Sequence, residues 1–151
     1  MVADTNLKFV GHTTILVRND LYTFSCKGRL LISYRYANIL RQKSNFEQLR
    51  LNSSPDHREF FALANALDRI YITGGLSKAT SGCTTSVLIF DLKKCEFQRE
   101  RAMQDARRLH SSTICGNKLF VLGGSNDAGK RLSSIEMLDV TKRTSTWMII
   151  H

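Results

Sequence analysis

Two stretches decide the fold: RIYITGG at residues 69–75 and KLFVLGG at residues 118–124. Each is an apolar run that ends in two glycines, and the two glycine pairs lie 49 residues apart. Paired glycines after a strand let the chain turn through positive φ without strain at a Cβ, and they let neighbouring backbone approach closely. Recurrence at this spacing predicts a repeat architecture.

The recurrence extends beyond the glycines. Each pair is followed by a second apolar run that ends in an acid, Asp91 or Asp139, and then by one aromatic residue, Phe97 or Trp147. A further shift of 49 residues towards the N-terminus gives a degenerate copy, with Ser25-Cys26 in place of the glycines. We therefore divide the chain, residues 1–151, into a degenerate repeat and two fuller ones, at 1–50, 51–100 and 101–151.

The third repeat has the fullest motif, which consists of Arg107, His110, Gly123, Gly124, Asp139 and Trp147. This set resembles a kelch repeat. The second repeat keeps Gly74, Gly75 and Asp91 but has Phe97 for the tryptophan. The resemblance is strong over 58–147 and weak over 1–50. It implies an all-β fold of kelch-type β-propeller blades, each a four-stranded antiparallel sheet beside a central channel.

The resemblance also implies roles for the motif residues. In the family the Arg and His are largely structural and join blade edges, and we expect Asp91 and Asp139 to accept hydrogen bonds between blades. Trp147 and Phe97 are expected to pack in blade cores. None of these residues is predicted to be catalytic, because a lone acid lacks the partner that general acid–base chemistry uses.

Strand patterns fill the two fuller repeats. Short runs rich in β-branched and aromatic residues, separated by turn residues, predict the strands. They lie at 60–64, 69–73, 85–91, 96–100, 111–115, 118–122, 133–139 and 145–149. A helix is the alternative at 60–67, where Ala and Leu are common, but the match to 111–115 favours a strand. Cys115 is predicted to be a small buried hydrophobe.

Three blades are fewer than the four to eight of a closed propeller. We therefore expect an incomplete or open ring, either as part of a longer protein or as an array whose unpaired edge strands self-associate. The number of blades in the full protein is left open.

Composition makes several function classes less favoured. The net charge is +9 and the pI about 9.7, but no dense Lys/Arg cluster or nucleic-acid motif appears, so nucleic acid is not the favoured partner. The four cysteines form no C-x-x-C pair and the four histidines have no metal-ligand spacing, so no metal, cofactor or enzyme activity is predicted. Without a signal peptide or a membrane-spanning run, the cytoplasm is the expected location, with the nucleus as the alternative.

One loop imitates a nucleotide site. Residues 124–130 read G-x-x-x-x-G-K after a strand, but Arg131 stands where a phosphate-binding loop needs a hydroxyl to ligate magnesium. The matching loop of the second repeat lacks both the second glycine and the lysine. We interpret the segment as an interaction loop.

Strand alternation predicts where a partner binds. The loop between second and third strands and the connection between blades fall on one side, which therefore holds the long polar segments 51–59, 76–84, 101–109 and 125–132. Long loops on a rigid scaffold are where binding usually resides. The predicted partner-binding residues are Lys78, Arg108, Ser125, Asn126, Asp127, Lys130 and Arg131.

The predicted function is non-enzymatic protein–protein interaction. The basic loop face suits an acidic protein partner, and no small-molecule substrate is expected. One alternative is the substrate-recognition part of a ubiquitin-ligase adaptor, by resemblance to kelch proteins with that role. A basic nucleic-acid-binding propeller and an enzymatic propeller are the others.

Overall fold

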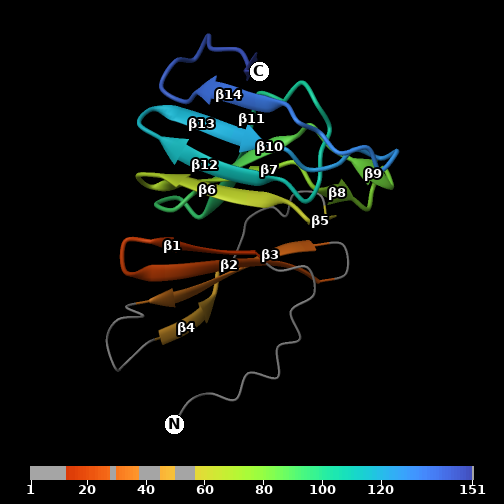
Figure 1. The fold of residues 1–151 in the computed structure, drawn as a ribbon. Helices are drawn as coiled ribbons and strands as arrows, with labels where there is room; N and C mark the ends of the chain where they lie inside the picture. The colour runs from red at the N-terminus through yellow and green to blue at the C-terminus, as the bar shows by residue number, and fades with distance from the viewer. Residues whose placement is uncertain (1–12, 28–29, 38–44, 50–56, 151) are drawn as a thin grey trace.

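The computed structural model describes residues 13–27, 30–37, 45–49 and 57–150, and these residues form an all-β structure (Figure 1). The described residues contain no helix that could span a membrane.

Three antiparallel four-stranded sheets follow one another along the chain. The first consists of β1 (Thr13–Val17), β2 (Asp20–Lys27), β3 (Leu30–Ala37) and β4 (Asn45–Gln48). The second consists of β6 (Ala62–Ala66), β7 (Arg69–Thr73), β10 (Val87–Asp91) and β11 (Glu96–Glu100). The third consists of β12 (Ser111–Cys115), β13 (Lys118–Leu122), β14 (Ile135–Asp139) and β15 (Met148–Ile150). In each sheet the strands pair in chain order.

The first strands of the three sheets lie side by side. β6 contacts β1 on one side and β12 on the other, and Figure 1 shows these three strands in succession. A smaller sheet, β5 (Arg58–Glu59), β8 (Leu76–Ser77) and β9 (Gly82–Cys83), forms at the loop ends of the second sheet. The arrangement is that of partial kelch-type blades, as the sequence predicts.

The strand predictions agree closely with the structure. Strands β7, β11, β12 and β13 have the predicted bounds, whereas β10 and β14 begin two residues later than predicted and β15 spans only Met148–Ile150. Strand β6 is displaced by two residues because Phe60 adopts a φ of 56°, which bends the chain just before the strand. The helix alternative at 60–67 is wrong.

Backbone conformation repeats with the sequence spacing. The turn in the first hairpin of each sheet contains one residue of positive φ: Arg18 at 57°, Leu67 at 53° and Gly116 at 59°, each 49 residues after the last. Leu109 at 54° likewise follows Phe60 by 49 residues. At this hairpin turn the first repeat thus has the same positive φ as the others, although it lacks their paired glycines.

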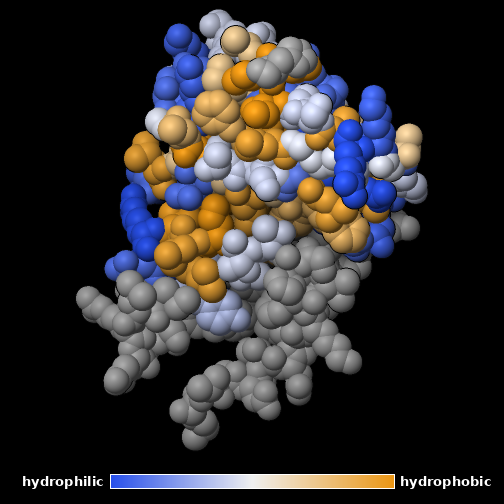
Figure 2. Space-filling view, in the orientation of Figure 1, coloured by the Kyte–Doolittle hydropathy of each residue, from blue (hydrophilic) through white to orange (hydrophobic). Residues whose placement is uncertain are grey.

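The two faces of the third sheet differ in exposure. Leu119 and Val121 are fully buried on one face, whereas Leu122 is 36% and Met148 55% exposed on the other. Figure 2 shows hydrophobic residues at the surface over this sheet. The prediction that Cys115 is buried is wrong, because strand alternation places it on the more exposed face.

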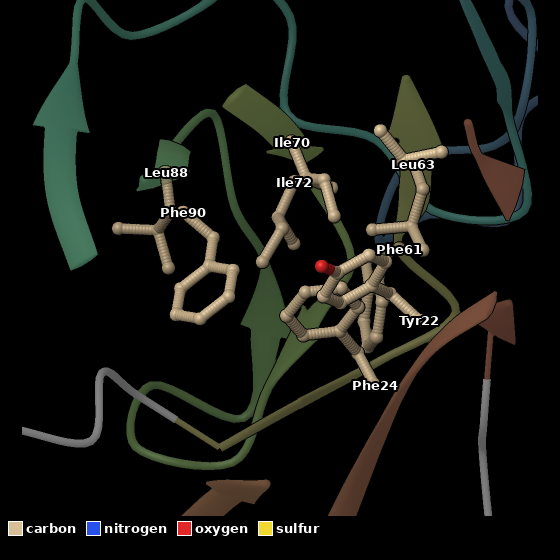
Figure 3. Packing of buried hydrophobic residues seen from close by; sticks show 9 residues of the cluster. Tyr22, Phe24, Phe61, Leu63, Ile70, Ile72, Leu88 and Phe90 are labelled. Carbon is tan, nitrogen blue, oxygen red and sulfur yellow. The ribbon is translucent and has the colours of Figure 1, made fainter. Parts of the chain in front are cut away.

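Two hydrophobic clusters join the sheets. Between the first and second sheets, Val17, Tyr22 and Phe24 meet side chains of the next sheet that include Phe61, Ile72 and Phe90 (Figure 3). Between the second and third sheets the buried cluster comprises Ala64, Tyr71, Val87, Ile89, Met103, Leu119, Val121, Leu138 and Trp147. Each sheet is therefore stabilised by burial against its neighbour rather than by a core of its own.

Candidate functional site

Two buried arginines fasten the loop side of the second and third sheets. Arg58 is 1% and Arg107 0% exposed. Arg58 Nη1 donates to the carbonyl oxygens of Gly74 and Ser86, both at 3.3 Å, and Arg107 Nη1 donates to those of Gly123 at 2.7 Å and Ser134 at 3.2 Å. The same two contacts thus recur in both repeats. Each arginine ties the incoming connection to the end of its own sheet.

The third sheet adds a buried ion pair. Arg107 Nη2 lies 2.8 Å from Glu136 Oε1, and both side chains are fully buried. Glu136 also accepts hydrogen bonds from the backbone N–H groups of Gln104, at 2.6 Å, and Asp105, at 3.0 Å. A buried carboxylate needs such partners because losing its hydration is costly. Leu88 takes the corresponding place in the second sheet.

His110 links the second sheet to the third. Its Nε2 lies 2.9 Å from Thr73 Oγ1, which is 2.6 Å from Ser112 Oγ. Burial, and then the positive charge of Arg107, lower the pKa of His110 from 6.5 to about 4. The imidazole is therefore neutral at neutral pH, and its contacts join sheets.

Glycines allow the close approach at these junctions. A Cβ on Gly74 (φ 56°) would lie 2.5 Å from the carbonyl oxygen of Arg107, and one on Gly124 (φ 90°) would lie 2.5 Å from that of Arg108. Both distances are below those of real Cβ contacts, and both φ values are strained for other residues. The Gly75 N–H donates to the Arg107 carbonyl at 2.9 Å, across the junction.

The long loops gather on one side, as strand alternation predicts. β5, from the connection that leads into the second sheet, pairs with β8 of the following loop, with Glu59 opposite Leu76. In the third repeat Arg108 and Ser125 form the corresponding bridge, and Ser125 also bridges to Arg131. Connections and loops are thus joined by backbone hydrogen bonds.

The loop at 125–132 is held in place at its tip. Asn126 Oδ1 accepts from the Lys130 N–H at 3.0 Å, and Asp127 Oδ1 accepts from the Cys83 N–H at 2.6 Å, which links the loops of two sheets. The Cys83 N–H and thiol lower the pKa of Asp127. Burial, and then Asp127, raise the pKa of the Cys83 thiol to about 11, so the thiol stays protonated.

The predicted partner-binding residues divide into two groups. Arg108, Ser125 and Asn126 are half-buried and hold the loops together, whereas the side chains exposed at the surface are Lys78, Asp127, Lys130 and Arg131. Lys78 Nζ lies 3.4 Å from Glu59 Oε1, a neighbour that the sequence did not single out.

Two cations of this face are not neutralised nearby. Within residues 57–150, the side chains of Lys130 and Arg131 form no ion pair with described groups. Figure 2 shows hydrophilic residues gathered near the end where β8 and β9 lie. The face is therefore a set of fastened loops with positive charge at their exposed tips.

Comparison with known proteins identifies the repeat. Residues 106–150 match the family model for the Kelch motif, the same segment that holds Arg107, His110 and the paired glycines. Residues 106–150 are therefore a kelch repeat. Over 90 residues, 56% of its length, the chain is 32% identical to Alpha-scruin of Limulus polyphemus. Over 68 residues, 45% of the chain, it is 34% identical to Kelch-like protein 40 of Mus musculus. The matched regions span about a tenth of those relatives, at 10% and 11% of their lengths.

The kelch acids act differently from our expectation. Asp91 Oδ1 accepts from the N–H groups of Lys93 and Lys94, and Asp139 Oδ1 accepts from the N–H and hydroxyl of Thr141. The prediction that they accept hydrogen bonds between blades is wrong: in the described residues they cap the turn that follows their own strand. Asp and Asn commonly stabilise turns in this way.

The kelch Arg, His and aromatic residues have distinct contacts. The Arg107 side chain stays within its own repeat and only its backbone joins the second sheet, whereas the His110 side chain crosses the junction. Trp147 is 6% exposed and its Nε1 donates to the Arg101 carbonyl at 2.8 Å. Phe97 packs against Phe24 and Phe90 at the other junction.

The opposite side of the kelch sheets carries clefts at the short turns. One, of about 530 Å³, lies between the second and third sheets and includes Leu67, Tyr71 and Asn117 in its lining. Another, of about 220 Å³, occupies the same place between the first and second sheets. Across the described ranges, no group of three or more His, Cys, Asp and Glu side chains could hold a metal ion.

Proposed function

We propose that this chain is a non-enzymatic protein-interaction module that binds a partner through the long-loop face. The proposed contact residues are Lys78, Arg108, Ser125, Asn126, Asp127, Lys130 and Arg131. The observation that carries the proposal is the pair Lys130 and Arg131, exposed in a loop that Asn126 closes on itself and that Asp127 links to Cys83 of the neighbouring loop. Fastened loops lose little conformational entropy on binding, which favours affinity.

The charge of this face suits an acidic partner. Opposite charges across an interface raise the association rate and specificity more than they raise affinity. The engagement of His110 and Arg107 in contacts that hold the sheets together supports a structural rather than a catalytic role. Division into repeats at 1–50, 51–100 and 101–151, and residence in the cytoplasm, are parts of the same proposal.

Two other roles are predicted, one from the family resemblance and one from the sequence. A role as the substrate-recognition part of a ubiquitin-ligase adaptor is a hypothesis that rests only on resemblance to kelch proteins with that role; one similar relative is named Kelch-like protein 40. Self-association through open blade edges is a prediction from the sequence.

The test compares two Lys-Arg pairs. A photo-crosslinker at Ala128 identifies a candidate partner, and affinity for the purified candidate is then measured. Lys130→Glu/Arg131→Glu should weaken binding about tenfold, or roughly 1.4 kcal/mol, mainly by slowing association and most strongly at low salt. The control, Lys142→Glu/Arg143→Glu, changes the net charge equally at exposed positions in the turn after β14, and binding should be nearly unchanged.

Two results would contradict the proposal. If both double variants weaken binding equally, net charge rather than the loop face attracts the partner. If neither does, the candidate binds elsewhere.

A further inference from the structure

The third sheet has an apolar face that the described residues leave open. Its register places two rows of three side chains across β13, β14 and β15. The open face is formed by Phe120, Leu122, Ile135, Met137, Met148 and Ile150. Leu122 is 36%, Met148 55% and Ile150 36% exposed, and the other three are half-buried. Monomeric proteins rarely expose adjoining apolar side chains in this way without a binding role.

The second sheet shows what such a face looks like when it is covered. Tyr71, Val87 and Ile89 hold the positions that correspond to Phe120, Ile135 and Met137, and they are only 1%, 0% and 5% exposed. They are buried because the third sheet packs on them. The open face therefore has the side-chain pattern of a sheet-packing surface.

The surroundings of the motif glycines also show that no described residue covers the third sheet on this side. A Cβ on Gly74 would meet the Arg107 carbonyl at 2.5 Å and His110 Cε1 at 2.7 Å, both from the sheet that covers it. Gly123 has a similar φ of 63°, yet its nearest such atom is the Leu132 carbonyl oxygen at 3.5 Å, within the same repeat. No described residue approaches Gly123 as the third repeat approaches Gly74.

We propose that a second copy of this chain covers the open face, with the two third sheets packed face to face about a two-fold axis. Closed two-fold dimers are the commonest homo-oligomers, and they need a self-complementary patch. The open face is apolar over its two rows, and at its end Lys118 and Asp139 stand opposite each other in the register. It therefore carries no net charge although the chain carries +9, so that two copies can approach there without direct repulsion.

The area of the open face determines how stable the proposed dimer should be. Four strands about 4.8 Å apart and five residues long, at about 3.3 Å each, give a footprint of roughly 300 Å². Side-chain relief enlarges that area, but it stays below the roughly 800 Å² per partner of a stable complex. The dimer is therefore weak and forms only at high protein concentration. It does not depend on the long-loop face, and it uses a sheet face rather than the strand edges.

Sedimentation velocity over roughly two decades of protein concentration tests the proposal, because mass action makes the dimer fraction rise with concentration. Leu122→Glu and Met148→Glu should each raise the dissociation constant at least about tenfold, since they place a carboxylate in the contact. Leu67→Glu is the matched control, because Leu67 is 85% exposed in the β6–β7 turn and should leave the constant unchanged. Each variant replaces an exposed side chain, and circular dichroism checks that it folds.

Cys115 gives a second measurement that needs no variant in the face. It is exposed and follows Thr113 on the same side of β12. With Cys26, Cys83 and Cys95 replaced by serine, maleimide labelling of Cys115 should slow as concentration rises. A monomer at every concentration overturns the proposal, whether Cys115 is reactive or protected. So does a dimer insensitive to Leu122→Glu and Met148→Glu, since its contact lies elsewhere.

Discussion

The two junctions between sheets share one geometry but differ in chemistry. Between the first and second sheets, Phe24 meets Phe61 and stacks edge-on against Phe90, with ring centroids 5.6 Å apart. Between the second and third, the residues 49 positions later are Thr73 and His110, which are hydrogen-bonded. Both members of the pair change together, from two rings to a hydroxyl and an imidazole. The repeat fixes which positions meet, and the contact can be apolar or polar.

The second and third sheets also differ in the residue at the position that pairs with the buried arginine in the third sheet. Arg107 has Glu136 within its own sheet, whereas Leu88 stands at that position in the sheet that holds Arg58. Leu88 instead joins the hydrophobic cluster with Phe24 and Phe90. The third repeat thus relies on buried charge where the second relies on apolar packing.

The largest expected loss of stability comes from replacing Glu136 of the third repeat by leucine, the residue at the corresponding position of the second repeat. Glu136→Leu leaves Arg107 buried without its carboxylate and removes the acceptor for two backbone N–H groups. Loss of one partner from a buried ion pair costs about 3–5 kcal/mol of unfolding free energy. Urea unfolding followed by the fluorescence of Trp147, the only tryptophan, measures the change.

Glu136→Gln is the control for this change, because it keeps hydrogen-bonding oxygen in place without the charge. We expect it to lose less stability than Glu136→Leu. Equal stability of wild type and Glu136→Leu would mean that the ion pair contributes nothing beyond an apolar contact.

A smaller difference is expected between two glycines of the same motif. Gly74→Ala creates the 2.5 Å contact with the Arg107 carbonyl and should destabilise the protein by about 3 kcal/mol. Gly123→Ala adds only the strain of positive φ, about 1 kcal/mol, because its surroundings are open. Thermal unfolding of both variants compares a covered junction with an uncovered one. Equal losses would show that Gly123 is as closely packed as Gly74.

Much of the fold could be predicted because the repeat supplies a second copy for comparison. The paired glycines and the apolar runs correctly predicted the type of sheet and four strands with the observed bounds. The sequence could not show the partner of a residue across a junction. Asp91 and Asp139 were therefore assigned to contacts between blades, whereas their carboxylates cap local turns.

Exposure was harder to predict than strand position. An apolar strand has two faces, and Cys115 was expected to be buried because the sequence does not say which face is covered. For the candidate site, strand alternation correctly predicted that the long loops lie on the same side of the sheets. The hydrogen bond that the Cys83 N–H donates to Asp127 joins residues 44 positions apart, and no local sequence pattern indicates it.

The last prediction concerns pH and again compares the two junctions. His110 has a pKa near 4 in the folded protein and an ordinary value of 6.5 when unfolded, so protonation favours the unfolded chain. Stability from this group is complete above pH 6.5 and falls as the pH drops towards 4. Between pH 7 and 5 the loss of unfolding free energy is about 2 kcal/mol.

The double variant Thr73→Phe/His110→Phe tests this dependence. It recreates the pair Phe24 and Phe61 and removes the titration of His110, while the other histidines and the acids stay unchanged. Urea unfolding at pH 7 and pH 5 should therefore show a shallower loss for the double variant than for wild type. Parallel losses in the two proteins would mean that His110 is not held neutral by its junction, and that the polar junction is no more sensitive to acid than the apolar one.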